Sequence, residues 1–490
     1  MEMIYGVKDK PPFGKLVLFA LQQLLAILAA TIAVPMIIQN GMQPSAALFG
    51  AGVGTIVYLL FTKFKSPVFL GSSFAFLGSM SAAFAGASTM ALGYLGLLIG
   101  AVFAGLVYVI IAIIVKFCGT KWIDKIMPAV VIGPTVAIIG LSLAGNAIGD
   151  LTNGSFSDGG AYISIVCGLV TLGVTIGCSV FGKKMLKMIP FIIGILAGYI
   201  VATIFTAFSY IDGAPSVLRV IDFSTFQTLS QGSAWYPDFS FLTAFNVHGG
   251  GYGDGNIGAY IGSIAVAYIP VAFVVFAEHI ADHKNISSII EHDLLKDPGL
   301  HRTLLGDGVG SMVGAIFGGC PNTTYGESVG CVAISRNASV ATIFVTACMA
   351  ILSAFLAPFT LFLSSIPKCV MGGVCVSLYG FIAVSGLKMI QKVDLNDNRN
   401  LFTVSVILIA GVGGMIVQFG AVTITSVACA LILGILTNVF VNIGGKDKPV
   451  AAENTAEQSA ETQGESETNE GTPTVSDDTA EVSESDKTTE

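Results

Sequence analysis

Residues 322–330 read Asn-Thr-Thr-Tyr-Gly-Glu-Ser-Val-Gly, a short polar and glycine-rich stretch inside an otherwise apolar part of the chain. A comparable stretch, Leu-Gly-Ser-Ser-Phe-Ala-Phe, occupies residues 70–76. Backbone that is not helical is tolerated at membrane depth only where surrounding protein or a cavity satisfies its N–H and C=O groups. The two stretches therefore predict a pair of broken membrane segments whose free backbone groups are available to a ligand.

The composition predicts that lipid is the solvent for most of the chain. Hydrophobic residues make up 53% of the 490 residues, charged residues only 11%, and the mean hydropathy is +0.80. Soluble proteins carry about 25% charged residues, so a soluble chain of this length could not cover its own surface. We expect membrane lipid as the partner and no nucleic acid.

The apolar runs predict an all-α polytopic protein with fourteen transmembrane segments, counted at about 20 residues a segment. The runs at 305–319 and 322–335 are the shortest and are rich in glycine. The expected segments are 15–38, 45–62, 66–86, 91–117, 128–148, 161–181, 187–211, 258–280, 305–319, 322–335, 338–365, 367–389, 400–418 and 420–443.

Basic residues predict the orientation of these segments. With an even number of segments, twenty Lys and Arg residues fall on the side of both termini, and only Arg219 and Lys368 fall opposite. Lys and Arg are enriched in cytoplasmic loops. Both termini are therefore expected in the cytoplasm, with residues 212–257 as an extracellular loop.

An internal repeat is visible at residues 128–133 and 367–372, which both read Pro-x-x-Val-x-Gly. They fall in the fifth and twelfth segments, and the two broken stretches fall in the third and tenth. An offset of seven, an odd number, places the two halves in opposite orientations. This predicts the 7+7 inverted repeat that is common among secondary transporters.

The ionisable residues inside apolar runs are the candidate functional residues, because charge is costly in a bilayer. Glu278 follows an apolar run, Asp282 lies one helical turn further on the same face, and Glu327 lies in the tenth segment. Each could instead pair with a neighbouring helix or cap a broken segment, and for His279 this structural role is the stronger reading. His283 is expected at the cytoplasmic boundary without a functional role.

Two carboxylates in an apolar setting suit a planar heterocycle. They can accept hydrogen bonds from its ring N–H groups, while free backbone N–H groups donate to its carbonyls. Phe74 and Tyr325 can add aromatic contact with the ring. A carboxyl group in apolar surroundings also takes up a proton more readily than one in water, so a proton is the expected coupling ion and no cofactor is expected.

Several motifs together resemble the nucleobase–ascorbate transporter family, also called nucleobase:cation symporter-2. The likeness runs from about residue 6 to residue 444 and is strongest to members that transport uracil. It rests on Gln22-Gln23, Ala-Ala-Thr-Ile-Ala-Val-Pro at 29–35, the stretch 70–76, Ala-Glu-His-Ile at 277–280, Asp-Pro-Gly-Leu-His-Arg at 297–302, the stretch 321–330, and Val-Met-Gly-Gly-Val at 370–374.

The resemblance implies short antiparallel strands in the third and tenth segments and two domains that move against each other like an elevator. The core domain would comprise residues 15–117 and 258–365, and the gate domain 128–211 and 367–443. Residues 1–14 would form a cytoplasmic N-terminus. The family also implies a homodimer in the cytoplasmic membrane.

The same resemblance implies a set of site residues. Glu278 and Glu327 would bind the base, and the backbone of Phe74 and Gly326 would meet its carbonyls. Protons would be coupled through Glu278, Asp282 and Glu327. The residues expected to line the rest of the pocket are Ala30, Ser73, Tyr325 and Tyr379.

Alternatives remain open for the substrate. Uracil transporters of the family commonly have His where Asp282 stands, and purine transporters often have Asp, so xanthine or urate is the alternative to uracil. Glu327 favours uracil, because purine transporters more often have Gln there. An anion transporter of the same fold would avoid two buried carboxylates at its site, and no nucleophile–base spacing indicates a membrane enzyme.

The remaining features suggest no further chemistry. None of the nine cysteines forms a CxxC pair or lies in a Cys/His cluster, so no metal site is expected. Residues 451–490 carry twelve acidic residues and one lysine, a net charge of −11. A segment of this composition cannot bury a core, so residues 445–490 are expected to be a disordered acidic cytoplasmic tail.

Overall fold

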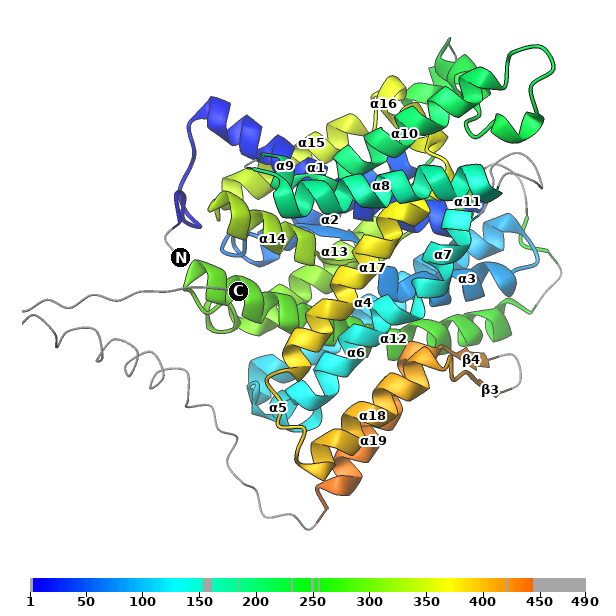
Figure 1. The fold of residues 1–490 in the computed structure, drawn as a ribbon. Coiled ribbons are helices and arrows are strands. Elements are labelled where there is room, and N and C mark those ends of the chain that lie inside the picture. The colour runs from blue at the N-terminus through cyan, green and yellow to red at the C-terminus, as the bar shows by residue number, and fades with distance from the viewer. Residues whose placement is uncertain are drawn as a thin grey trace, which may run out of the picture. The chain divides into compact units, whose positions relative to one another are not determined.

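Helices make up most of the described fold, and two short β-ladders accompany them (Figure 1). The computed structural model describes residues 3–152, 161–183, 185–230, 232–247, 251–253, 256–419 and 422–443. The tail predicted at 445–490 lies outside these residues.

Within the described residues, eight helices are long and apolar enough to cross a membrane. A ninth crossing is possible where α15 (Val340–Ser353) and α16 (Ala357–Ser365) meet at a bend of 84°. The eight are α1 (Phe13–Ile38), α2 (Pro44–Phe61), α4 (Met90–Cys118), α6 (Ala129–Ser142) continued by α7 (Ala144–Thr152), α8 (Ala161–Phe181), α10 (Pro190–Phe208), α12 (Ile257–Ile290) and α17 (Lys368–Ile390).

The count of fourteen segments therefore stays a prediction. The five remaining ranges hold elements that fall short of this test of length and apolarity, although each contains regular structure. One of them is α13 (Leu300–Gly318), a glycine-rich helix that packs between α2 and α4.

The two broken segments contain the short strands that the family resemblance implies. β1 (Leu70–Ser72) leads through η1 (Phe74–Phe76) into α3 (Leu77–Ala85), and β2 (Asn322–Thr324) leads into α14 (Gly326–Ser335). The strands are antiparallel, with Leu70 opposite Thr324 and Ser72 opposite Asn322. Each strand thus supplies hydrogen-bond partners to the other at a depth where water is absent.

Glycines allow the ladder to sit close to its neighbours. A Cβ on Gly71 would lie 2.2 Å from the ring of Tyr325, so only glycine leaves room for that ring. Asn322 Nδ2 donates to Gly50 O at 3.2 Å, and a Cβ on Gly54 would lie 2.5 Å from Asn322 Nδ2. The small residues of α2 thereby let β2 and α13 approach its backbone, as is common between membrane helices.

The final third of the chain differs from the expected pair of helices at 400–418 and 420–443. α18 (Asn398–Val412) ends early, and β3 (Val417–Phe419) pairs antiparallel with β4 (Val422–Ile424) before α19 (Ser426–Val441) begins. Gly413 and Gly414, the latter with φ of 70°, follow the end of α18. Glycine readily adopts this left-handed conformation, so the chain turns there instead of continuing as a helix.

Short helices connect the long ones. In the predicted extracellular loop, α11 packs against α4 and α13. The connecting elements are α5 (Lys121–Ile126), α9 (Met185–Met188), η2 (Ser216–Leu218), η3 (Phe223–Ser230), η4 (Gly232–Trp235), α11 (Ser240–Ala244) and η5 (Leu295–Gly299).

The long helices pack as two groups. In the first, α13 contacts α2 and α4, α12 contacts α4, and α15 contacts α1 and α2. In the second, α17 contacts α6, α7 and α8, α8 contacts α10, and α18 contacts α6 and α19. The groups meet where α12 lies against α6, β4 and α19, and where α1 lies against α10 and α17.

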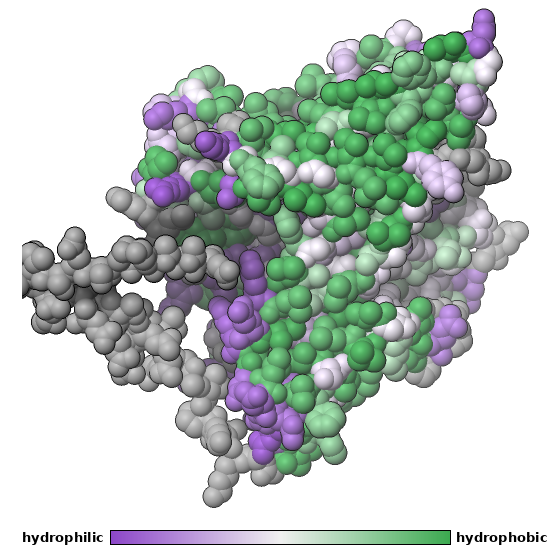
Figure 2. Space-filling model, in the orientation of Figure 1, coloured by the Kyte–Doolittle hydropathy of each residue, from purple (hydrophilic) through white to green (hydrophobic). Residues whose placement is uncertain are grey.

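Large apolar side chains cover much of the outer surface of the bundle. Figure 2 shows them across the face that carries α8, α10, α17 and α18, with hydrophilic side chains gathered at its edges. Phe117 is 78% exposed, Phe181 82% and Ile409 75%. Patches this large and apolar mark interaction surfaces, and here the helix lengths identify the partner as lipid.

Candidate functional site

A cavity of about 270 Å³ lies between the two groups of helices. Its walls come from α1, η1, α12, β2 and α14 of the first group and from α6, α8, α10 and α17 of the second. The lining residues are Ala26, Phe74, Val136, Ser179, Lys187, Pro190, Phe191, Glu278, Ala281, Asp282, Asn285, Thr323, Tyr325, Gly326, Glu327, Gly330, Cys331, Ile334, Phe381, Ile382 and Ser385.

Helix α12 presents two carboxylates to this cavity from one face. Glu278 is half-buried, and Asp282, one turn further, is 8% exposed. The Thr324 hydroxyl donates to Asp282 Oδ2 at 2.7 Å. An ideal Cβ on Gly326 would lie 3.8 Å from Asp282 Oδ1. Strand β2 therefore holds one oxygen of Asp282, while the other lies beside the first residue of α14.

The N-terminus of α14 forms the opposite wall. Glu327 lies in its first turn and is half-buried, and Gly326 before it is exposed to the cavity. The first N–H groups of an α-helix lack partners within the helix, and the helix dipole adds positive charge there. This end of α14 can donate hydrogen bonds to a carbonyl oxygen, while the Glu327 carboxylate can accept one.

Two aromatic residues contribute to the site in different ways. Phe74 lines the cavity and meets the Tyr379 ring edge-on, with centroids 5.4 Å apart. Tyr379 is 3% exposed and supports Phe74 from behind without lining the cavity. The Tyr325 ring lies over Gly71, and its hydroxyl donates to Ser72 O at 2.9 Å. A ligand would meet the Tyr325 ring, because the hydroxyl is already bonded.

Six of the nine residues predicted for the site line the cavity together: Phe74, Glu278, Asp282, Tyr325, Gly326 and Glu327. Ala30, Ser73 and Tyr379 do not. Ala30 is fully buried in α1, and Ser73 is fully buried with its N–H donating to Pro321 O at 2.9 Å. Both support the wall around the broken segments instead of forming its surface.

The sequence analysis missed several lining residues. Ala281 and Asn285 lie three and seven residues after Glu278, so helical periodicity could have identified them. Thr323 is 2% exposed, and its hydroxyl is without a hydrogen-bond partner among the described residues. No pattern in the sequence distinguishes Thr323 from Thr324, whose hydroxyl instead bonds Asp282.

Ser328 bonds to two other segments that lie beside it, helix α1 and the residue before β1. Gln23 Nε2 donates to Ser328 Oγ at 2.5 Å and lies 3.3 Å from Ser328 O. The Phe69 N–H donates to Ser328 Oγ at 3.1 Å. One fully buried hydroxyl thus joins α1, the residue before β1 and the first turn of α14.

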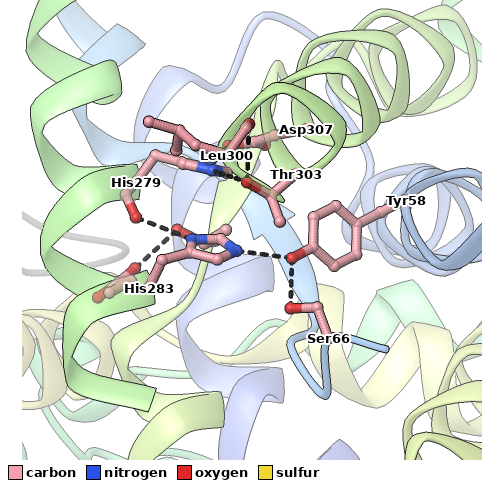
Figure 3. A network of polar contacts seen from close by, with 9 residues as sticks. Tyr58, Ser66, His279, His283, Leu300, Thr303 and Asp307 are labelled. Atoms are coloured by element: carbon pink, nitrogen blue, oxygen red, sulfur yellow. Dashed lines mark hydrogen bonds and ion pairs between the residues drawn. The ribbon is translucent and has the colours of Figure 1, made fainter. Parts of the chain in front are cut away.

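A polar network occupies the side of α12 next to the carboxylates (Figure 3). His279 Nδ1 lies 2.7 Å from Asp307 Oδ2, and His279 Nε2 lies 3.0 Å from Thr303 Oγ1. His283 Nε2 lies 2.8 Å from the Tyr58 hydroxyl. His279 thus has a structural role, as its sequence context favours. Its partner is Asp307, a residue that the sequence did not single out.

His283 lies in the protein interior, while its expected place at the cytoplasmic boundary stays a prediction. It is fully buried, and its ring stacks on that of His279 with centroids 3.9 Å apart. The hydropathy pattern alone could not show this, because Asp282, His283 and Lys284 read together as a polar helix end.

The groups that line the cavity are suited to holding a small ligand by hydrogen bonds. Among the described residues, no group of three or more His, Cys, Asp or Glu side chains is placed to hold a metal ion. Carboxylate acceptors, backbone donors and aromatic rings line one partly open cavity between the two packed helix groups.

A polytopic bundle with a carboxylate-lined cavity between two helix groups is the architecture of a membrane transporter. The transmembrane domain of the cyanobacterial bicarbonate transporter BicA superposes with a TM-score of 0.55 at 14% identity, over 89% of this chain and 99% of that domain. This likeness shows the fold alone.

Sequence comparison then identifies the family. Residues 14–420 match a family described as "Permease family", whose short name refers to xanthine and uracil permeases. The uracil permease of Bacillus caldolyticus is 38% identical over 93% of this chain and 98% of its own length. The uracil permease of Bacillus subtilis (strain 168) is also 38% identical, over 89% and 94%. The chain belongs to the xanthine/uracil permease family, nucleobase:cation symporter-2, and is a transporter, not an enzyme.

Proposed function

We propose that this permease imports uracil across the cytoplasmic membrane together with protons. The observation that carries the proposal is the meeting of Glu278, Glu327 and the N-terminus of α14 in one cavity. The relatives named as uracil permeases span nearly the whole chain. Their names and this cavity together support a nucleobase as the substrate.

Hydrogen-bond matching supports uracil. Its ring N–H groups require acceptors, which Glu278 and Glu327 supply, and its carbonyls require donors, which the first turn of α14 supplies. Phe74 gives the ring an aromatic surface. Unpaired polar groups at such a site penalise ligands that lack the matching groups, which is a source of selectivity.

Proton coupling follows from the crowding of acids. Glu278, Asp282 and Glu327 line the same cavity. Like charges close together disfavour the fully ionised state, so a proton that accompanies the substrate stabilises the loaded site. The coupling ion would then be a proton held by this set of carboxyl groups, with no further cofactor.

The transport step we propose is an elevator-like movement of a core domain against a gate domain. The two helix groups, each packed mainly within itself with the cavity between them, support this division. The proposal includes fourteen segments in a 7+7 inverted repeat, both termini in the cytoplasm, and a homodimer. The similar starts of α6 and α17, each directly after a proline, support the repeat.

Uptake of radiolabelled uracil tests the substrate and the site. Glu278→Gln and Glu327→Gln should each reduce uptake by about tenfold or more, because a neutral amide weakens a charge-assisted bond and offers a donor where an acceptor is needed. Asp222→Asn, a change in a partly exposed loop residue outside the cavity lining, is the control and should transport normally. Normal uptake by both glutamine variants would show that the site is assigned wrongly.

Competition distinguishes the substrates. Asp282 favours the alternative of a xanthine or urate permease, because it offers a further acceptor beside Gly326. If excess xanthine or urate blocks uptake more strongly than unlabelled uracil, the purine alternative replaces uracil. Insensitivity of uptake to external pH and to protonophores would contradict proton coupling. An anion transporter of this fold is disfavoured by the three cavity carboxylates.

A further inference from the structure

The fully buried histidines of α12 alternate with its cavity carboxylates. Glu278 and Asp282 face the cavity, and the residue after each, His279 and His283, faces α2 and α13 instead. Successive residues of an α-helix point about 100° apart. Any rotation of α12 that displaces the histidines therefore displaces the two carboxylates as well.

We propose that Tyr58 and His283 are positioning residues, which fix the rotation of α12 and thereby place Glu278 and Asp282 in the cavity. The inference rests on the proposed roles of those carboxylates, Glu278 in substrate binding and proton coupling and Asp282 in proton coupling. It assigns a task to a histidine and a tyrosine that lie outside the cavity and touch no ligand.

When the His283 ring is neutral, the donor and the acceptor of each hydrogen bond around it can be assigned in only one way. His283 Nδ1 lies 2.8 Å from His279 O, and a carbonyl can only accept, so Nδ1 carries the proton. Nε2 then accepts from the Tyr58 hydroxyl at 2.8 Å. Tyr58 in turn accepts from the Ser66 hydroxyl at 2.6 Å. Each group has a defined donor and acceptor, which favours one side-chain arrangement.

The same chain of bonds connects α12 to the other wall elements of the cavity. Tyr58 belongs to α2, and Ser66 lies in the segment that leads into β1 (Figure 3). Thr55, one turn before Tyr58 in sequence, accepts the Leu70 N–H at 3.0 Å. Helix α2 is therefore bonded both to the histidine of α12 and to the strand that precedes Phe74.

A second hydrogen bond holds α12 on its cavity side, where the Thr324 hydroxyl donates to Asp282. α12 is thus held from β2 on one face and from α2 and α13 on the adjacent face. Binding groups need to be fixed within about 0.5 Å to be fully effective. Removing the Tyr58 hydroxyl leaves the buried His283 Nε2 without a donor and removes the bond from α2, while the bonds from α13 and β2 remain.

Tyr58→Phe tests the inference, with Tyr268→Phe as the matched control. Both tyrosines are fully buried in the first helix group, but the Tyr268 hydroxyl has no partner among the described residues. We expect Tyr58→Phe to raise the KM for uracil uptake by about tenfold with Vmax per transporter close to wild type. Tyr268→Phe should leave KM unchanged.

A double-mutant cycle separates positioning from a general loss of stability. If Tyr58 acts through the carboxylates of α12, the effects of Tyr58→Phe and Asp282→Asn on KM should not add, whereas those of Tyr268→Phe and Asp282→Asn should add. His283→Gln, which retains a polar group toward Tyr58, should retain more affinity than His283→Leu. These results would support the assignment.

Two outcomes would overturn the positioning role: an unchanged KM in Tyr58→Phe, with or without a fall in Vmax and thermal stability, or additive effects with Asp282→Asn. Failure of the proposed function would look different. In that case the wild-type protein itself would not take up uracil, and the cycle would be measured with the base that it does take up.

Discussion

Gly326 presents bare backbone to the cavity at the start of α14. An added Cβ would make only an ordinary contact with Asp282 Oδ1, at 3.8 Å, and the residue does not have a positive φ. The protein itself therefore has room for a side chain at this position. A ligand that accepts hydrogen bonds from this helix end leaves no room for a side chain at residue 326. The methyl group of an alanine would lie between the ligand and the backbone N–H groups.

The variant Gly326→Ala should therefore fold normally and bind poorly. We expect its affinity for uracil to fall by about tenfold or more, because the ligand could no longer approach the backbone donors of α14. Isothermal titration calorimetry on the purified protein would measure this, and thermal unfolding would establish that stability is kept.

Gly262→Ala is the control for that experiment. Gly262 lies in α12 with open space around it and is not among the residues that line the cavity. It should keep full affinity and gain slightly in helix propensity. Wild-type affinity in Gly326→Ala would show that the ligand does not approach this backbone.

Single residues of the site could be predicted from sequence when they are ionisable. Burying a charge in a membrane is energetically unfavourable, so such residues stand out in an apolar run. Glu278, Asp282 and Glu327 interrupt apolar runs, and the structure brings all three to one cavity. Ala30 and Tyr379 carry no such signal, and whether they reach the cavity depends on packing. Asp307 interrupts an apolar run too, but its partner His279 became apparent only when α12 and α13 were placed side by side.

At the level of elements, the hydrogen bonds of Ser328 join α14 to α1 and to the residue before β1. Replacing it by alanine leaves the buried Phe69 N–H without its acceptor and removes one partner of Gln23. We expect Ser328→Ala to lower the free energy of unfolding by about 1–3 kcal/mol, the cost of an unsatisfied buried polar group. Thermal unfolding in detergent would measure it.

Ser263→Ala provides the comparison for Ser328→Ala. Among the residues that the structure describes, the Ser263 hydroxyl bonds only Tyr260 O in its own helix, at 2.7 Å. Its removal should change stability by much less. Equal losses in the two variants would argue against a special role for the Ser328 junction.

A salt bridge joins two loops next to the broken segments. Lys65 Nζ lies 2.5 Å from Asp297 Oδ1, and this contact holds the pKa of the Asp297 carboxyl below its usual range. A lowered pKa in the folded state stabilises the protein above the unfolded value of about 3.9, and the contribution is lost as the pH falls through the folded value.

Asp297→Asn should therefore be less stable than the wild type at neutral pH, by a small amount because both side chains are substantially exposed. The melting curves of the two proteins should converge as the pH is lowered from about 5 toward 3. Lys65→Met, which removes the Lys65 contact but leaves His292 3.5 Å from Asp297 Oδ2, should show the same pattern at a smaller size. A difference that is constant over the whole pH range would contradict the assignment to this pair.

Element type was predictable where hydropathy and polarity agree, and element ends were not. The broken character of residues 70–76 and 322–330 follows from their small and polar residues. By contrast, the run at 400–418 stays apolar as far as Val417, yet α18 stops at Val412. Gly413-Gly414 is the signal that a count of apolar residues overlooks, because glycine is apolar in composition but favours a turn in conformation.

For the whole molecule, the important contact is the one between the two helix groups. Gly78 of α3 faces Thr425, the residue before α19, and an ideal Cβ on Gly78 would lie 3.9 Å from Thr425 Cβ. This separation is within the range of disulfide-bonded cysteines. A covalent link at this point would prevent the groups from moving past each other.

The double variant Gly78→Cys/Thr425→Cys should lose uracil uptake when oxidised and regain it after reduction with dithiothreitol. Each single variant should transport normally under both conditions, which controls for the nine native cysteines, all of them free. A cross-linked protein, verified by gel mobility, that still transports at the wild-type rate would rule out movement between these groups.

The overall architecture was predictable only in part. High hydropathy marks both the helices that cross the membrane and the helices that are buried inside the protein. It identifies the long helices, such as α4 and α12, without ambiguity. It does not separate a short crossing helix from one that packs inside the protein, as α13 does between α2 and α4. The pairing of β1 with β2 requires knowledge of which distant segments meet.

That pairing has a consequence for how the protein is made. The Tyr325 hydroxyl bonds the Ser72 carbonyl across 253 residues of sequence. A ribosome that has delivered the first half of the chain to the membrane has delivered β1 without its partner, with polar backbone exposed in a setting that offers no water. The first half must wait in an incomplete state until β2 is inserted beside it. Nascent chains halted before residue 322 should accordingly be substrates for quality-control proteases, whatever the stability of the finished transporter.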